Sequence, residues 1–107
     1  MEICFKNKKL QKLCENHTKL KVKYGIVKAK RIVMRIGDLI DAVSLYDVSK
    51  LPQTGFHPLH HNRQGQFAIY TQQPYRIIFI IQNGSPDDLK SITSIEIIPI
   101  NENYHQK

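Results

Sequence analysis

The chain has 107 residues, enough for one domain with a two-layered core and too few for two such domains. Its 41% apolar and 23% charged residues are typical of a water-soluble globular protein, and its longest apolar run, Ile77–Ile81, is far too short to span a membrane. The net charge of +7 is uneven. Residues 1–35 hold eleven Lys and Arg against two acidic residues, hence +9, and residues 36–107 hold five against seven, hence −2. This basic half suits a polyanionic partner, and it equally suits solubility alone.

The two cysteines, Cys4 and Cys14, form no CxxC motif and have no second pair with which to bind zinc. We expect them to be reduced thiols and disfavour a disulfide between them. Lysines interrupt the N-terminal segment, so it lacks the apolar run of a secretory signal. These observations predict a cytoplasmic protein with no membrane anchor, metal or cofactor.

The N-terminal part of the chain predicts a strand followed by a short helix. Met1–Phe5 has apolar residues at alternate positions and is expected to form a strand. Lys8–Asn16 has an apolar stripe at helical spacing, with Asn7 as its N-cap. Lys19–Tyr24 alternates lysines with larger side chains, which favours a strand, but its residues are also good helix formers. Both alternatives stay open for this segment.

Ile26–Tyr46 predicts the main helix, with an apolar stripe toward the sheet and a basic face toward solvent. Gly37 lies inside it, at a cost of about 1 kcal/mol relative to Ala, and is a point where a strand or the first helix can approach closely. The predicted stripe consists of Ala29, Ile32, Val33, Ile36, Ile40 and Val43. The predicted exposed face carries Lys28, Lys30, Arg31 and Arg35, either as a solvated surface or as an RNA contact.

Three strands are expected in the second half, at Gln66–Thr71, Tyr75–Gln82 and Ser91–Ile98. The middle one is apolar on both faces and is predicted to be central. Pro99 lacks an amide donor and is expected to end the last strand or to lie at an edge. The order predicts a single α+β domain over residues 1–107, in which an N-terminal strand and two helices pack on a small, mainly antiparallel sheet.

Arg76 is the first candidate for a functional residue. It shares a strand face with Ile78 and Ile80, whereas Ile77 and Phe79 are expected to face the helices. We therefore expect Arg76 on the open face of the sheet, in a position with little packing. There its guanidinium suits a phosphate, or a carboxylate such as that of Glu96 or Glu102.

Histidines gather before the second strand. His57, His60 and His61 lie close in sequence to Arg63, and such a cluster suits proton transfer near neutral pH or a solvated loop. Their spacing lacks the helical HExxH pattern and a neighbouring carboxylate, so a dedicated metal site is not predicted.

Four fragments in order resemble the HigB-like toxins of the RelE/ParE superfamily. They are Gly55–Leu59 with its His-Pro-Leu, Gly65–Ile69, Tyr75–Phe79 with its aromatic-Arg-Ile, and the terminal pair Tyr104-His105. No single fragment is specific, but the order and spacing of the four are, and the resemblance covers nearly the whole chain.

The resemblance implies a toxin of a bacterial type II toxin–antitoxin system that cuts mRNA on the ribosome without a metal. A helix-turn-helix antitoxin is the implied partner, beside the ribosome and mRNA. The implied catalytic residues are His57, Arg76, Tyr104 and His105, with Arg76 as phosphate stabiliser and Tyr104 stacking on a base. His60 is a further catalytic candidate, which stands in place of a family lysine. The implied RNA- or ribosome-binding residues are Lys28, Lys30, Arg31, Arg35 and Arg63.

The chain also departs from the family pattern at three positions. His60 stands where the family often has lysine, Gln72 where it has a further arginine, and Asn103 where it has aspartate. Two alternatives therefore remain beside the ribonuclease. One is a ParE-like inhibitor that binds a protein target such as gyrase, and the other is a degenerate toxin that binds its antitoxin without cleaving RNA.

Overall fold

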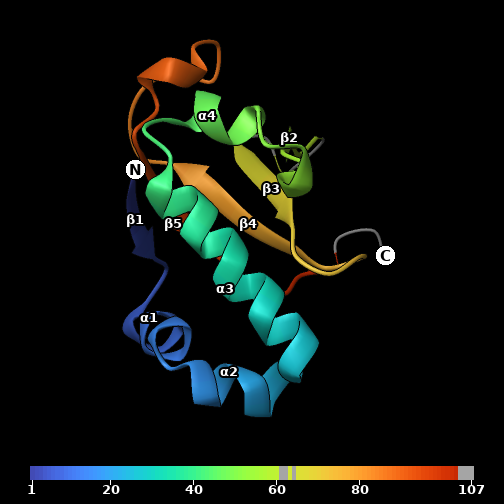
Figure 1. Ribbon diagram of the computed structural model, residues 1–107. Coiled ribbons are helices and arrows are strands. Elements are labelled where there is room, and N and C mark those ends of the chain that lie inside the picture. The colour runs from blue at the N-terminus through green and yellow to red at the C-terminus, as the bar shows by residue number, and fades with distance from the viewer. Residues whose placement is uncertain (61–62, 64, 104–107) are drawn as a thin grey trace.

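The computed structural model describes residues 1–60, 63 and 65–103, and places helices against one face of a five-stranded sheet (Figure 1). The strand order is β1-β5-β4-β3-β2, with β1 parallel to β5 and every other pairing antiparallel. The predicted α+β class and antiparallel meander are confirmed. The strands are β1 (Glu2–Phe5), β2 (His57–Pro58), β3 (Gln66–Tyr70), β4 (Arg76–Ile81) and β5 (Ser94–Ile97).

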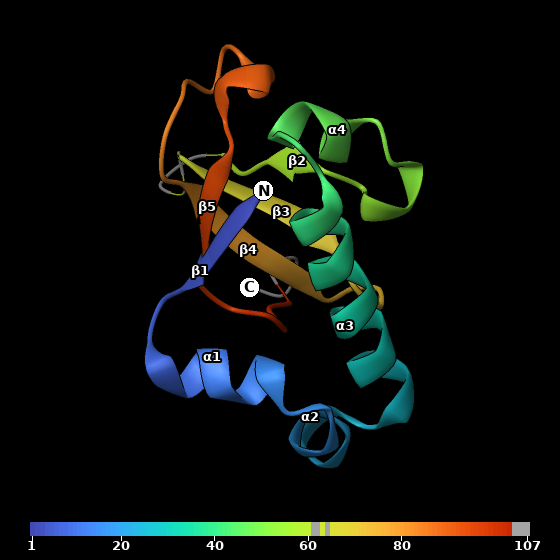
Figure 2. The ribbon, with the colours of Figure 1, turned by 60° about the vertical axis from the view of Figure 1, so that its left-hand side comes forward.

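The helices number more than the two predicted. Three α-helices precede the short α4 (Figure 2), and short 3₁₀ turns occur after it in the described ranges. No helix in these described ranges is long and apolar enough to cross a membrane. The bounds are α1 (Lys8–Glu15), α2 (His17–Tyr24), α3 (Ile26–Asp41), α4 (Leu45–Ser49), η1 (Pro52–Thr54) and η3 (Leu89–Ser91).

Asparagine side chains start the first two helices. Asn7 accepts a hydrogen bond from the Leu10 amide at 2.9 Å, as predicted, and Asn16 accepts one from the Lys19 amide at 3.1 Å. The second cap settles the open alternative for Lys19–Tyr24, which is helical despite its alternating pattern. Gly25 then adopts φ +86°, a left-handed conformation that suits glycine, and separates α2 from α3.

The main helix ends five residues earlier than predicted. Ala42 leaves helical geometry, and the Asp47 carboxylate accepts a hydrogen bond from the Val43 amide at 2.9 Å, so a new helix begins at Leu45. The predicted apolar stripe is wrong at its end, because Ile40 is 54% exposed and Val43 is 76% exposed. The residues of α3 that are buried are Ala29, Ile32, Arg35, Ile36 and Leu39.

Gly37 does not admit a close approach, contrary to the prediction. A Cβ atom built on it would have no neighbour within 4 Å, because Gly37 borders an open groove between α1, α3 and β1. It therefore lowers helix stability without a packing gain at this position.

The main core lies between α3 and the sheet. Phe67 and Ile69 of β3 and Ile77 and Phe79 of β4 point into it and are buried against the apolar residues of α3. The opposite face of the sheet has a smaller buried cluster of Leu59, Ala68 and Ile78. β4 is thus buried on both faces, as its sequence predicts.

The C-terminal segment continues to pair with β4 beyond the end of β5. After Ile97 the carbonyl of Pro99 accepts a hydrogen bond from the Ile78 amide at 3.1 Å. Glu102 then forms an antiparallel bridge with Arg76, with main-chain hydrogen bonds of 2.8 and 2.9 Å. Proline therefore ends the regular strand, as predicted, while the chain remains beside β4 as far as the start of that strand.

Candidate functional site

The sheet brings two candidate site residues, His57 and Arg76, and their neighbour Tyr70 to the face that α3 does not cover. His57 of β2 lies opposite Ala68 of β3, and Tyr70 lies opposite Arg76 of β4. Directly opposed residues point to the same face, and so do residues two apart in a strand. His57, Tyr70 and Arg76 therefore share the face of the sheet away from the main core. This confirms the predicted face for Arg76.

Arg76 is buried rather than exposed on that face. Only 1% of it is accessible, and its guanidinium donates to the Pro74 carbonyl oxygen at 2.7 Å. The guanidinium carbon lies 4.0 Å from the centroid of the Tyr70 ring. The prediction that Arg76 has little packing is therefore wrong. Its charge is held beneath Tyr70 and fastens the turn before β4.

His57 has one ring nitrogen fixed by the main chain. Its Nδ1 lies 2.8 Å from the Gly55 carbonyl oxygen, which only accepts hydrogen bonds, so Nδ1 carries the proton. In the neutral ring Nε2 is then the basic nitrogen, the form that a general base requires. The half-buried His57 ring lies 6.1 Å from the Tyr70 ring, centroid to centroid.

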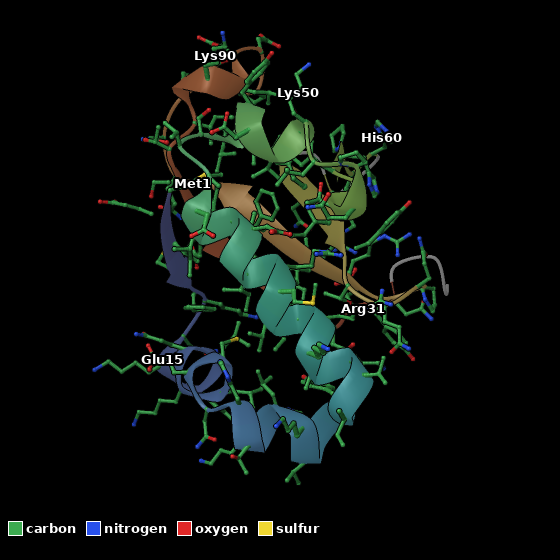
Figure 3. The ribbon with its side chains drawn as sticks, viewed as in Figure 1. Met1, Glu15, Arg31, Lys50, His60 and Lys90 are labelled. Carbon is green, nitrogen blue, oxygen red and sulfur yellow. The ribbon has the colours of Figure 1, made fainter. Side chains whose placement is uncertain are left out.

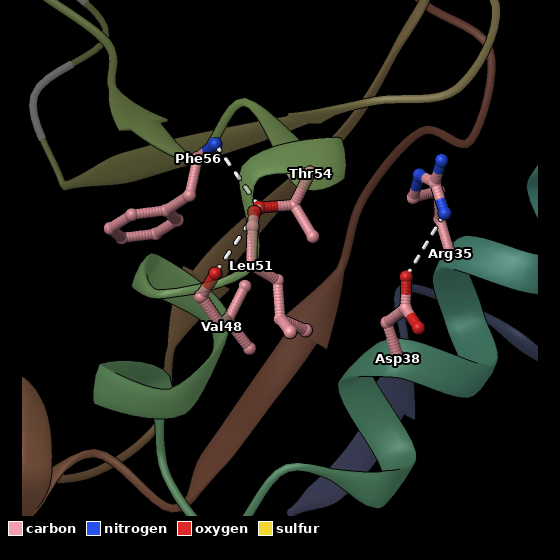
Figure 4. Close-up of polar contacts among 6 residues, drawn as sticks. All are labelled: Arg35, Asp38, Val48, Leu51, Thr54 and Phe56. Atoms are coloured by element: carbon pink, nitrogen blue, oxygen red, sulfur yellow. Dashed lines mark hydrogen bonds and ion pairs between the residues drawn. The ribbon is translucent and has the colours of Figure 1, made fainter.

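Thr54 fixes the loop that carries His57. Its buried hydroxyl lies 2.8 Å from the Leu51 carbonyl oxygen and accepts a hydrogen bond from the Phe56 amide at 3.3 Å (Figure 4). These contacts order the turn on either side of Gly55, the residue whose carbonyl holds His57. The histidine segment before Gln66 was predicted as a loop, and within it His57–Pro58 instead form β2.

Tyr70 is a central residue that sequence reasoning did not select. It contacts Arg76 and lies next to His57, and its ring also covers Gly55. A Cβ atom on Gly55 would lie 2.3 Å from the ring, so only glycine fits there without displacing Tyr70. The alternation along β3 places Tyr70 on the other face of the strand from the core side chains Phe67 and Ile69. This alternation was the sequence signal that could have identified Tyr70 as a neighbour of Arg76.

Arg63, predicted to bind RNA, has a carboxylate partner within the chain. Its Nη1 and Nη2 both donate to the Glu102 carboxylate, the latter at 3.1 Å, and its Nε donates to Gln66 Oε1 at 3.0 Å. This fork-to-carboxylate geometry is the strongest form of an arginine ion pair. An RNA contact by Arg63 stays a prediction, and it would compete with Glu102.

The basic residues of α3 divide into exposed and engaged side chains. Lys30 and Arg31 are exposed, as predicted, and Figure 3 labels Arg31. Lys28 is half-buried, with its Nζ 3.5 Å from the Tyr75 ring centroid.

Arg35 does not lie on the exposed face predicted for it. It is 7% exposed and pairs with Asp38 at 3.0 Å (Figure 4). It follows the buried Ile32 by three positions, so the helical turn places it on the same side as the core residues.

The remaining candidates are less constrained. His60 is exposed, in the loop after β2. His61, Tyr104 and His105 lie outside the described residues. Within residues 1–60, 63 and 65–103, no group of three His, Cys, Asp or Glu is arranged to hold a metal ion. Cys4 and Cys14 are free thiols, the first exposed and the second buried.

No family model matches this chain, and no curated protein matches it either. Among solved structures it is similar to the YoeB/ParE toxin from Agrobacterium tumefaciens. The TM-score is 0.49 and the sequence identity 18%, over 92% of this chain and 93% of that one.

Proposed function

We propose that this chain is a type II toxin of the RelE/ParE kind that cleaves mRNA on the ribosome without a metal, and that a helix-turn-helix antitoxin neutralises it. The observation that supports the proposal best is His57, whose Nδ1 is held by the Gly55 carbonyl so that Nε2 is the basic nitrogen. Two of the fragments that resemble the family, those with His57 and Arg76, lie on the same face of the sheet, since both residues border Tyr70.

In this reaction the 2′-hydroxyl of a nucleotide attacks the adjacent phosphate, and the 5′ oxygen of the next nucleotide leaves. A base takes the hydroxyl proton, an acid protonates the leaving oxygen, and positive charge stabilises the phosphorane. His57 Nε2 serves as one of the two proton carriers. The buried Arg76 cation raises the local positive potential from beneath Tyr70, where low dielectric increases its effect. Tyr104 and His105, outside the described residues, are proposed to supply base stacking and the second proton carrier.

A toxin that binds its antitoxin without cleaving RNA is the second candidate, and two observations favour it. Arg76 is 1% exposed, and the fork of Arg63 is engaged by Glu102, so neither guanidinium faces solvent freely in this arrangement. A phosphate needs direct donors as well as a favourable potential. Cleavage by this chain therefore requires either a rearrangement at Arg63 or a donor from the ribosome.

The test is cleavage of a programmed mRNA on purified ribosomes, with chelator present, mapped by primer extension. We expect cleavage by the wild-type chain and a loss of about 10²–10⁴-fold in rate for His57→Ala, as for removal of a general acid or base. His17→Ala is the matched control, because His17 is an exposed histidine at the start of α2. Intact mRNA on the purified ribosomes contradicts the proposal. Expression of the chain in bacteria then separates the alternatives, because DNA breaks during growth arrest point to gyrase and unbroken DNA points to the non-cleaving toxin.

A further inference from the structure

Two contacts meet at Glu102 and fasten the C-terminal part of the chain to the site. Its main chain bridges to Arg76, with hydrogen bonds of 2.8 and 2.9 Å. Its carboxylate receives both terminal nitrogens of Arg63. One residue of the C-terminal segment is therefore tied to the site by main chain and side chain together.

The ion pair joins segments across the open face of the sheet. Arg63 belongs to the loop between β2 and β3, and its Nε also holds Gln66 at the start of β3. Glu102 belongs to the segment on the other side of β4 from β3. Both side chains are only about 30% exposed, at 29% and 28%, so the pair is partly shielded from solvent.

The position of Glu102 fixes the described part of the C-terminal segment beside the site. Antiparallel partners have Cα atoms about 4.5–5.5 Å apart, which places Glu102 directly beside Arg76. Asn103 follows Glu102 directly, so its backbone order depends on how firmly Glu102 is held.

We propose that Arg63 and Glu102 form a positioning pair, which holds the described chain end, Glu102 and Asn103, to the start of β3 across the open face, beside His57 and Arg76. In this arrangement Arg63 contributes to cleavage through Glu102. That contribution rests on the proposed function, whereas the holding of Glu102 and Asn103 does not. The pair touches neither substrate nor reacting atoms, so its loss is expected in kcat with little change in KM.

The experiment compares the full-length wild type with Glu102→Gln, with Arg63→Glu, and with the charge swap Arg63→Glu/Glu102→Arg. Glu96→Gln is the matched control, because Glu96 accepts a hydrogen bond from Gln82 on the same sheet but lies on β5, away from the chain end. The first measurement is the NMR order parameter of the Asn103 amide, which needs no activity. The second is ribosome-dependent cleavage, separated into kcat and KM.

We expect the Asn103 order parameter to fall from a rigid value near about 0.85 to below about 0.6 in both single variants. We expect kcat to fall about 10- to 100-fold, as for a reacting group displaced by about 1 Å. The swap should recover both, and Glu96→Gln should change neither. The proposed pair is overturned if the Asn103 order parameter is unchanged in the single variants, or if the charge swap restores neither the order parameter nor kcat above the values of the single variants. An order parameter that falls while kcat stays constant overturns its catalytic role. If the wild type does not cleave, the proposed function fails, and the order parameters alone decide whether the pair holds the chain end.

Discussion

Arg76 and Tyr70 face each other across the β3–β4 pair, with the guanidinium carbon 4.0 Å from the centroid of the ring. The tyrosine ring is half-buried and closes over an arginine that is almost completely buried. The same ring borders His57 and covers Gly55. Tyr70 thus contacts Arg76, lies next to His57, and packs on the turn at Gly55 that fixes the His57 ring.

Tyr70→Leu is expected to lower the free energy of unfolding by about 1–3 kcal/mol, because the ring's attraction to a desolvated cation is lost and the packing over Gly55 is disturbed. Tyr70→Phe keeps the ring and should change it by no more than about 0.5 kcal/mol. Urea unfolding measures both. Equal losses in the two variants would show that the hydroxyl, rather than the ring over Arg76, is what stabilises this corner.

Arg76→Ala is expected to destabilise the fold by about 2–4 kcal/mol, since it opens a cavity and leaves the Pro74 carbonyl without its donor. The position therefore does not allow a test of chemistry alone, in contrast to the expectation from sequence. Arg76→Lys retains the charge and the stem and should lose less. Urea midpoints for both variants, beside cleavage at matched folded fraction, separate the two contributions. A fully stable Arg76→Ala protein would contradict the burial argument.

The sequence predicted best those elements whose apolar pattern follows directly from burial. β3 alternates in sequence and β4 is continuously apolar, and the period of two in a strand was enough to assign Phe67, Ile69, Ile77 and Phe79 to the core face. The face of Arg76 was correct for this reason. α1 was correct as well, because its apolar stripe and its Asn7 cap indicate the same start.

Several errors arise where a single partner outside the element decides the outcome. The end of α3 depends on Asp47 accepting a hydrogen bond from the Val43 amide. Arg35 is a different case, because its position three residues after Ile32 places it on the buried side and only its charge suggested exposure. Tyr70, Gly55 and Arg76 come together only once β2, β3 and β4 are aligned. The Arg63–Glu102 pair is 39 residues apart in sequence, a separation that carries no local signal. Sequence patterns predict that a charged residue is exposed, and this prediction fails when a partner elsewhere in the fold allows the residue to be buried.

Cys14 makes stability depend on pH in the alkaline range. Burial, and then the charge of Glu15, raises the pKa of its thiol from 9.0 to about 11. The folded chain keeps this proton where the unfolded chain has lost it. The stabilisation is therefore present below pH 9 and is lost as the pH rises through about 11. Urea unfolding from pH 8 to 11 should show this decline in the wild type and a shallower one in Cys14→Ala. Parallel curves for the two proteins would exclude Cys14 as its source.

Fewer basic residues of α3 can be used to test RNA docking than the sequence suggests. Reversing the charge of Lys30, Arg31 and Arg35 together would leave the core intact only if all three lay on the exposed face that the sequence predicts for them. Because Arg35 is buried beside Asp38, Arg35→Glu places two carboxylates together and should unfold the chain. Only Lys30 and Arg31 are exposed enough to report on RNA docking without a loss of folding.

Lys30→Glu/Arg31→Glu is therefore expected to weaken ribosome association and to flatten its dependence on salt, since each lost phosphate contact lowers the log–log slope by about 0.9. The unfolding free energy should stay within about 0.5 kcal/mol of the wild type, because both side chains are exposed.

Lys50→Glu/Lys90→Glu is the matched control. It changes the net charge equally, and these two lysines flank Tyr46 at the top of the view in Figure 3, away from Arg31. Co-sedimentation over a salt series measures both variants. A specific surface on α3 predicts a flattened slope only in the first, because the second leaves the contacting lysine and arginine in place. Equal loss in both would mean that the overall charge of +7, rather than this helix face, attracts the ribosome.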